Sequence, residues 1–144
     1  LQSVVQYHTR IQVKEADEKE TIEPCCAYIA PANYHLLIEN DRTFAMDYSE
    51  TVKYSRPSID LTFESVARVY GNKAIGILLT GANDDGAAGL LEMKKRGAQC
   101  FAQDPKTAEV STMPQAAISN GAADSVIALN RIGLMLKDAA KKIH

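Results

Sequence analysis

Apolar and polar positions along residues 73–104 change between two periodicities. Residues 73–81 form an almost continuous apolar run with β-branched side chains, which predicts a strand covered on both faces. Residues 85–97 carry apolar side chains at helical spacing, with three basic residues in the last turn and Gly97 as a stop, and this pattern predicts a helix. Residues 98–104 are apolar again and predict a second short strand.

The same alternation continues to the end of the chain. A helix is predicted over residues 112–121, with Pro114 at its first position. Residues 125–129 predict a strand, and residues 130–144 predict a closing helix in which Asn130 is the N-cap. Strands and helices that alternate with short links are typical of parallel β-α-β units.

The first part of the chain has a different pattern, with shorter apolar runs separated by turns. Residues 11–16 and 25–31 predict two strands joined by an acidic turn, and residues 35–40 and 42–48 predict a β-hairpin. Residues 56–71 predict a helix. Together these elements predict one α/β domain: a doubly wound, mostly parallel sheet with helices on both faces and an antiparallel β-hairpin, which is a Rossmann-like three-layer sandwich.

Length and composition are those of a single globular domain: 144 residues, of which 46% are hydrophobic and 24% are charged. The 16 basic and 18 acidic residues give a net charge of -2, so the chain has no dominant basic field and nucleic acid is not expected as a partner. No apolar run approaches the roughly 20 residues that cross a bilayer, and no signal peptide is recognised at the start. A cytoplasmic location without membrane insertion is therefore expected.

The cysteines indicate neither a disulfide framework nor a zinc site. Cys25 and Cys26 are neighbours in a predicted strand, so their side chains point to opposite faces, and Cys100 lies in another apolar segment. The sequence contains no C-x-x-C and no His/Cys cluster at zinc spacing. Three buried free thiols are expected.

Two adjacent aspartates, Asp84 and Asp85, follow the strongest predicted strand in the stretch TGANDDGA. In doubly wound sheets functional groups gather beyond the carboxyl ends of the strands, and Gly81 and Gly86 permit tight backbone geometry there. The local pattern leaves three interpretations open: a cap for the following helix, a carboxylate that orients a catalytic imidazole, or an anion site at the helix N-terminus. Phosphate binding is weakly supported, because no Lys-Ser/Thr follows Gly86.

Other candidates for chemistry are few. His8, His35 and His144 are scattered along the chain, and His35 is predicted to be structural or at the surface. Ser58 is interpreted as the cap of the helix over residues 56–71, and no G-x-S-x-G nucleophile elbow is present. The residues thus supply one candidate orienting carboxylate and no evident nucleophile.

Five segments of the chain, taken in order, carry the signature of a family. They are VKEADEKETIEPCCAYIAPANYHLLIE (13–39), SRPSIDLTFESVA (55–67), GILLTGANDDGAAGLLEMKKRGAQCFAQDP (76–105), MPQAAI (113–118) and GAADSVIAL (121–129). Together they resemble the catalytic domain of the chemotaxis protein-glutamate methylesterase family, CheB. The resemblance covers nearly the whole chain.

That resemblance implies a doubly wound α/β domain that hydrolyses γ-glutamyl methyl esters on the cytoplasmic helices of chemoreceptors and, in many members, deamidates receptor glutamines. It also implies a triad of Ser, His and Asp in that chain order. The family motif T-G-M-G-x-D-G-A puts the triad aspartate at Asp85, and Asp84 falls in the variable slot as a solvent-side or capping residue.

Two positions depart from the family motif: Ala82 and Asn83 replace its Met and second Gly. The family Met lines the active site, and its backbone N–H is a candidate oxyanion donor, so Gly81, Ala82 and Asn83 are the implied lining residues. Ala82 keeps the N–H and loses the side chain. Asn83 is expected to tolerate the left-handed backbone that the glycine adopts.

The resemblance puts the family's serine and histidine upstream of Leu1. VVQYH at residues 4–8 looks like the context of the family histidine, but His8 is not expected to be the base, because the family has a helix between that histidine and the VKEA strand. Residues 1–144 are therefore expected to be about the C-terminal two-thirds of one methylesterase domain and to be inactive alone.

The implied partners are methylated chemoreceptor helices, together with a receiver domain and a chemotaxis kinase of a phosphorelay. The segment Arg56–Asp60 is expected to border the receptor-binding groove, and no metal or organic cofactor is implied. Two other interpretations stay open. One is a binding or regulatory module of this family that has lost catalysis, as Ala82 and the missing serine would suggest; the other is a nucleotide-binding Rossmann-like domain, which the lack of G-x-G-x-x-G disfavours.

Overall fold

The computed structural model describes residues 2–7, 10–51 and 56–143. Its helices are α1 (Gln2–Tyr7), α2 (Ile59–Tyr70), α3 (Ala87–Lys95), α4 (Thr112–Ser119) and α5 (Ile132–Ile143). Its strands are β1 (Gln12–Glu15), β2 (Cys26–Ile29), β3 (His35–Ile38), β4 (Phe44–Asp47), β5 (Ile75–Leu78), β6 (Gln99–Gln103) and β7 (Ser125–Ile127). Every predicted strand and helix is present, with shorter bounds, because an apolar run marks burial and burial extends beyond the hydrogen-bonded ladder.

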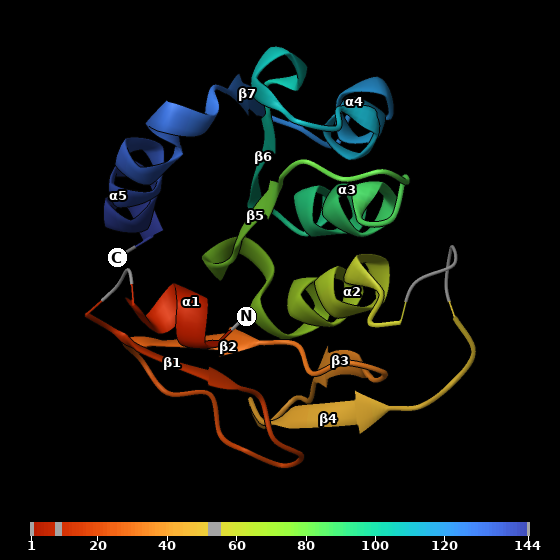
Figure 1. The fold of residues 1–144 in the computed structure, drawn as a ribbon, viewed down its shortest axis with the longest axis vertical. Coiled ribbons are helices and arrows are strands. Elements are labelled where there is room, and N and C mark those ends of the chain that lie inside the picture. The colour runs from red at the N-terminus through yellow and green to blue at the C-terminus, as the bar shows by residue number, and fades with distance from the viewer. Residues whose placement is uncertain (1, 8–9, 52–55, 144) are drawn as a thin grey trace.

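The C-terminal region is a parallel sheet with helices on both faces. β5, β6 and β7 pair in that order and all run parallel, and Figure 1 shows α3 and α4 on one face and α5 on the other. Leu78, Leu90, Met93 and Cys100 are almost fully buried between the sheet and α3. Burial raises the pKa of the Cys100 thiol to about 12. This arrangement confirms the predicted three-layer α/β fold.

The N-terminal region consists of two small sheets, in which β1 pairs parallel with β2 and β3 pairs antiparallel with β4. The acidic connection, residues 16–25, does not form a tight turn between β1 and β2. It runs along β4 instead, with Thr21 bridged to Thr43 and the Phe44 N–H donating to the Glu20 carbonyl at 3.0 Å. The chain therefore returns to the start of β1 before it enters β2, and the two strands are parallel.

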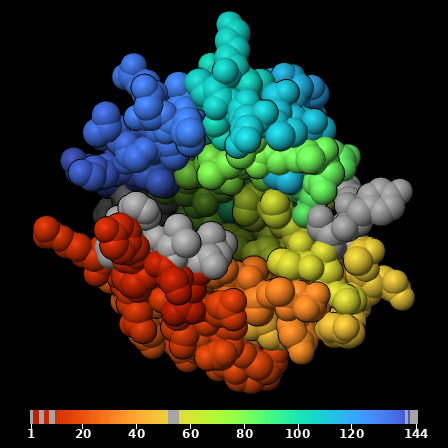
Figure 2. Space-filling view, viewed as in Figure 1, coloured from red at the N-terminus to blue at the C-terminus, as the bar shows by residue number. Residues whose placement is uncertain are grey.

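Helix α2 lies between the two regions. Figure 2 shows these regions as the red-to-orange lower half and the green-to-blue upper half of the molecule, and Figure 1 places α2 between α3 and the β3–β4 hairpin. Leu36 and Phe44 of the hairpin pack against α2 through Val66. On its other side α2 meets α3 at Gly89, where a Cβ atom would lie 2.9 Å from the Asp60 backbone. The glycine therefore permits the close approach of the two helices.

Two predicted helix starts differ from those observed. Pro114 is the third residue of α4 rather than its first, because the helix already begins at Thr112. Asn130 is not the N-cap of α5. It lies inside a 3₁₀ turn, Leu129–Arg131, closed by a hydrogen bond of 2.9 Å from the Arg131 N–H to the Ala128 carbonyl. The spacing of apolar residues predicted that both helices exist, but it does not fix the residue at which a helix begins. It also does not distinguish a 3₁₀ turn from the first turn of an α-helix.

The cysteines correct one prediction. All three are free thiols, but only Cys100 is buried, whereas Cys26 is half-buried and Cys25 is exposed. Cys25 has a φ of 59°, so it belongs to the turn before β2 rather than to the strand. The direction of its side chain is therefore not set by the alternation of side chains along β2.

None of the described helices combines the length and apolar character that a bilayer crossing requires. Across residues 2–7, 10–51 and 56–143, no group of three or more His, Cys, Asp or Glu side chains is arranged to hold a metal ion.

Candidate active site

The turn after β5 is fastened to the start of α4. The Gly81 N–H donates to the Val110 carbonyl at 3.0 Å, and the Met113 N–H donates to the Gly81 carbonyl at 3.0 Å. A Cβ atom on residue 81 would lie 2.5 Å from Met113 Cε. A side chain at this position would displace Met113, and the two backbone hydrogen bonds fix the start of the turn.

Asn83 shapes the next step of the turn. Its side-chain Oδ1 accepts a hydrogen bond of 3.0 Å from the Asp85 N–H, which is an Asx turn. Asn83 is not among the described residues with positive φ, so the predicted left-handed backbone is wrong and a side-chain hydrogen bond shapes the turn instead. Ala82 and Asp84 are exposed, whereas Asp85 is directed into the molecule.

The Asp85 carboxylate points to the N-terminus of α2 and is 1% exposed. Its Oδ1 accepts from the Ser58 hydroxyl at 2.9 Å and from the Asp60 N–H at 3.0 Å, and its Oδ2 accepts from the Ile59 N–H at 2.7 Å. The local pattern leaves three interpretations open: a cap for the helix that follows, an orienting carboxylate, or an anion site at the helix N-terminus. The structure shows a cap, but for α2 instead of α3.

Asp60 caps α3 in return. Its Oδ1 accepts from the Gly86 N–H at 2.9 Å and from the Gly89 N–H at 2.7 Å, and the residue is 4% exposed. Gly86, the N-cap residue of α3, has a φ of 102° and no side chain to cap with. Asp85, which lies just before α3, thus satisfies backbone amides at the start of α2, and Asp60 of α2 satisfies those at the start of α3. Such a capping contact contributes about 0.5–2 kcal/mol. We call this pair and the helix starts that it binds the α2–α3 junction.

Ser58 and His35 extend this junction to the hairpin. Ser58 occupies the N-cap position of α2, but its side chain makes no cap hydrogen bond; it donates to Asp85, which corrects the cap interpretation. The Ser58 N–H donates to Nδ1 of His35 at 3.0 Å, and His35 is fully buried. Of the two predicted alternatives for His35, structural or at the surface, the buried position fits the first, while His8 and His144 lie outside the described residues.

Ser58, His35 and Asp85 are the three residue types of a hydrolytic triad, but they do not have its arrangement. In a triad the hydroxyl bonds to the imidazole and the imidazole bonds to the carboxylate. Here the hydroxyl bonds directly to the carboxylate, and both imidazole nitrogens bond to backbone groups, those of Ser58 and Glu50. This cluster therefore holds Asp85 in place and supplies no activated nucleophile.

The segment Arg56–Asp60 has an outer and an inner part. The Arg56 guanidinium lies 4.0 Å from the centroid of the Tyr48 ring and donates through Nη1 to the Ser49 carbonyl at 3.0 Å. Tyr48 is largely exposed, whereas Ser58 is fully buried. The same short segment thus joins a cationic and aromatic surface to the buried carboxylate.

The Asp85 carboxylate can accept one more hydrogen bond than the described residues donate to it. A carboxylate offers about four lone-pair sites, and Asp85 uses three of them, two on Oδ1 and one on Oδ2. An imidazole N–H directed at Oδ2 would complete the set. A carboxylate whose orientation is fixed by other donors is what the third member of a triad requires.

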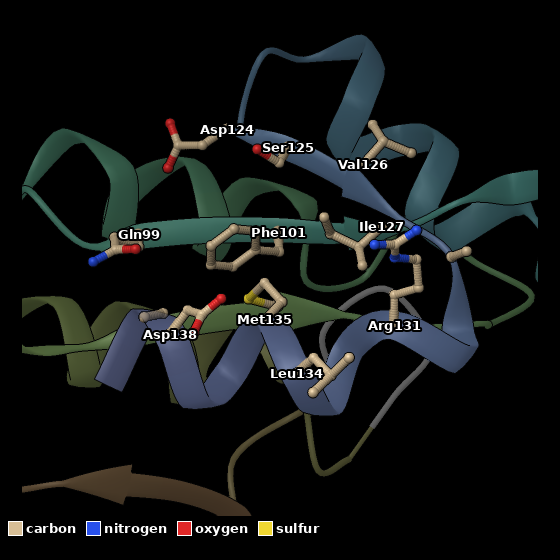
Figure 3. Close-up of a pocket in the computed structure, with 12 residues that line it drawn as sticks. Gln99, Phe101, Asp124, Ser125, Val126, Ile127, Arg131, Leu134, Met135 and Asp138 are labelled. Atoms are coloured by element: carbon tan, nitrogen blue, oxygen red, sulfur yellow. The ribbon is translucent and has the colours of Figure 1, made fainter. Parts of the chain in front are cut away.

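A cleft of about 660 Å³ lies elsewhere, between α5 and the sheet. Figure 3 shows Phe101 of β6, Ile127 of β7 and Met135 of α5 lining it. Its lining includes no residue of the turn 81–86. The cleft is therefore separate from the candidate active site, and it was not predicted from the sequence.

Comparison with known proteins links this geometry to a family. The CheB methylesterase family model matches residues 1–136. A protein of Leptospira interrogans is 51% identical over 122 residues, which cover 85% of this chain and 63% of the relative. A protein-glutamate methylesterase/protein-glutamine glutaminase of Burkholderia thailandensis is 45% identical over 132 residues, which cover 90% of this chain and 37% of the relative.

Among solved structures, the catalytic domain of Thermotoga maritima CheB methylesterase superposes with a TM-score of 0.79 at 32% identity, over 90% of this chain and 66% of that one. The superposition agrees with the α/β fold described above. The chain spans 63% of the length of the Leptospira relative and 66% of the solved domain.

Proposed function

The chain belongs to the CheB methylesterase family, and from this premise we propose that it is the aspartate-bearing part of a serine-type hydrolase acting on glutamate methyl esters of chemoreceptors. Relatives named protein-glutamate methylesterase/protein-glutamine glutaminase support both ester hydrolysis and deamidation of receptor glutamines. Asp85 is the triad aspartate in this proposal, and the serine and histidine belong to a segment that precedes residue 1. The chain covers 66% of the solved catalytic domain, which is consistent with residues of the domain lying outside residues 1–144.

One observation carries the proposal: the Asp85 carboxylate is buried beyond the carboxyl end of β5 and is held by three donors. Functional groups of doubly wound folds gather at that edge of the sheet. The lone-pair site on Oδ2 that these donors leave over matches the single N–H of an incoming imidazole. Its neighbour Asp84 is exposed and less suited to this role.

The reaction follows from these positions. The serine Oγ attacks the ester carbonyl carbon while the imidazole takes the hydroxyl proton. Asp85 accepts a hydrogen bond from the other imidazole nitrogen, which fixes the tautomer and stabilises the imidazolium that forms. The tetrahedral intermediate then breaks its bond to the methoxy oxygen, which leaves as methanol with the proton from the imidazolium. Water cleaves the acyl-enzyme in the same way and releases glutamate.

The turn of Gly81, Ala82 and Asn83 lines the reacting carbonyl in this proposal. The Ala82 backbone N–H donates to the oxyanion, an interaction that lowers the barrier by about 3 kcal/mol per donor. Ala82 is exposed at the end of β5 and lacks the long side chain of the family motif. The change enlarges the substrate side of the site and leaves the backbone chemistry intact.

The proposed substrates are the methylated cytoplasmic helices of chemoreceptors, so the proposed location is the cytoplasm. Arg56, stacked on the exposed ring of Tyr48, borders the groove in which such a helix would lie. The family resemblance adds a receiver domain and a chemotaxis kinase as regulatory partners.

The proposal is tested by measuring methanol release from methyl-labelled chemoreceptor. We use the completed domain, residues 1–144 joined to the segment that precedes them in the protein. Asp85→Asn is expected to lower kcat on the order of 10³–10⁴-fold with little change in KM, because the imidazole is no longer held in the productive tautomer. Asp84→Asn, on the same turn but exposed, is the matched control and is expected to retain activity. Circular dichroism and thermal melting give the folded fraction to which kcat is referred.

The outcomes separate the candidate functions. Full activity of Asp85→Asn contradicts the assignment of Asp85, and loss of activity in Asp84→Asn would point to Asp84 instead. A completed domain that folds and binds the receptor but releases no methanol supports instead a binding module that has lost catalysis.

A further inference from the structure

His35, the first residue of β3, has both ring nitrogens engaged by backbone groups. Nδ1 lies 3.0 Å from the Ser58 backbone N, and Nε2 lies 2.8 Å from the Glu50 carbonyl oxygen. A peptide N–H can only donate, so Nδ1 must be the accepting nitrogen and Nε2 must carry the proton. The ring is therefore the neutral Nε2–H tautomer, and it is 0% exposed.

Ser58 connects this ring to the candidate catalytic carboxylate. Its backbone is extended (φ -101°, ψ 128°) and is held on one side by the His35 ring. Its hydroxyl donates to Asp85 Oδ1 at 2.9 Å. A displacement of the Ser58 backbone would therefore move the hydroxyl away from Oδ1. His35 thus sets the position of a donor to Asp85 without touching Asp85 itself.

We infer that His35 is a positioning residue for the Asp85 carboxylate, acting through Ser58; this rests on the proposed function, because it needs Asp85 to serve an imidazole. Oδ1 is held by Ser58 and Asp60, and Oδ2 only by Ile59. With the Ser58 donor displaced, Oδ1 keeps only the Asp60 N–H, so the carboxylate is held less firmly and the remaining lone pair of Oδ2 is less well directed. Misplacement of a catalytic group by about 1 Å can cost 100-fold in rate.

The competing interpretation is that His35 only fills the core and satisfies two backbone groups. Both interpretations predict that substitution of His35 lowers stability, because an unpaired buried N–H or C=O is unfavourable. They differ in what happens to kcat when one or the other ring contact is kept. The Nδ1 contact leads to Asp85 through Ser58, whereas the Nε2 contact leads to Glu50, which is exposed.

Two amide variants separate the two contacts. His35→Asn puts a carbonyl oxygen near the position of Nδ1 and keeps the acceptor for Ser58, whereas His35→Gln puts an NH₂ near the position of Nε2 and keeps the donor to Glu50. In the completed domain, we expect His35→Gln to lower kcat for methanol release about 10- to 100-fold at unchanged KM. His35→Asn is expected to stay within about threefold of the unsubstituted domain. Each variant loses one buried hydrogen bond, so both should melt at lower temperatures.

Ser58→Ala, which removes the donor to Oδ1, gives a second measurement on the same path. Its kcat should fall as in His35→Gln, and the double variant should lose little more than either single one, because both changes release the same oxygen. Equal kcat losses in His35→Asn and His35→Gln, or none in either, overturn the inference, as do fully additive losses in the double variant. If Asp85→Asn is inactive in those same cases, the proposed function stands without this inference. An active Asp85→Asn removes both.

Discussion

Two regions of the molecule have carboxylates where the chain changes direction. In one region the carboxylates are buried and bind backbone amides, and in the other they form ion pairs in contact with solvent. In the α2–α3 junction, Asp60 and Asp85 are buried and bind backbone amides of fixed position. In the acidic connection after β1, Lys14 forms ion pairs with Asp17 at 3.5 Å and with Glu20. Those three side chains keep contact with solvent.

Exposure to solvent separates the two regions. The hydrogen bond from Lys14 lowers the pKa of Glu20, and the same contact raises the pKa of Lys14. Because these groups remain in water, solvent and salt replace most of what the pair supplies when it is broken. In the junction no such replacement is at hand, and removal of a carboxylate leaves buried N–H groups unpaired. The contribution of a carboxylate to stability thus depends on whether water can reach the groups that its removal leaves unpaired.

Breaking the junction on the α2 side should have the largest effect on stability. Asp60→Ala leaves the Gly86 and Gly89 N–H groups without their acceptor, and we expect it to lower the free energy of unfolding by roughly 2–5 kcal/mol. Urea unfolding of the completed domain measures the change, with Asp84→Ala as an exposed control. Equal effects of the two substitutions would contradict the distinction between buried and exposed carboxylates.

Forcing the two helices apart should have the next largest effect. Gly89→Ala places a Cβ atom 2.9 Å from the Asp60 backbone, so one helix must shift, and we expect a loss of about 1–3 kcal/mol in the free energy of unfolding. Gly133→Ala is the matched control, because a Cβ atom there meets nothing within 4 Å in the described structure. It should stabilise α5 by about 0.5–1 kcal/mol. A stabilising Gly89→Ala would show that the helices are not in close contact.

The smallest effect is expected in the acidic connection. The folded-state pKa of Glu20 is lowered below its ordinary value of 4.5, so the Lys14–Glu20 pair stabilises the fold above that pH and ceases to do so as the pH falls through the lowered pKa. Lys14→Met should therefore lower the melting temperature slightly at pH 7, and the difference should shrink as the pH falls through the lowered pKa of Glu20. A larger shift at low pH than at neutral pH would reverse the sign of this interpretation.

The parts of the fold that could be predicted from the sequence are those that depend on contacts between residues close together in the chain. The parallel β5–β6–β7 sheet was predicted, because each of its strands is a continuous apolar run next to a helical pattern. The parallel pairing of β1 and β2 was not, because it depends on the path of residues 16–25 along β4. Likewise, the apolar character of Cys25 predicts a strand, because it does not reveal a turn with positive φ.

The candidate site shows the same limit. The pattern of TGANDDGA singled out Asp85, but it pointed to the helix that follows as the one to be capped. The observed partners, Ser58 to Asp60, are far from Asp85 in sequence, and no local signal joins them. A buried polar residue such as His35 gives no sign in the sequence of which backbone groups it will bind.

The reciprocal capping of α2 and α3 also determines how the first turns of these two helices should open and close. The amides of Ile59 and Asp60 are protected by a carboxylate that leads into α3, and those of Gly86 and Gly89 by one that belongs to α2. Neither helix can fray at its first turn without releasing the other. In deuterium exchange these four amides should therefore behave as one cooperative unit, with a common protection factor, although they come from two distant stretches of chain.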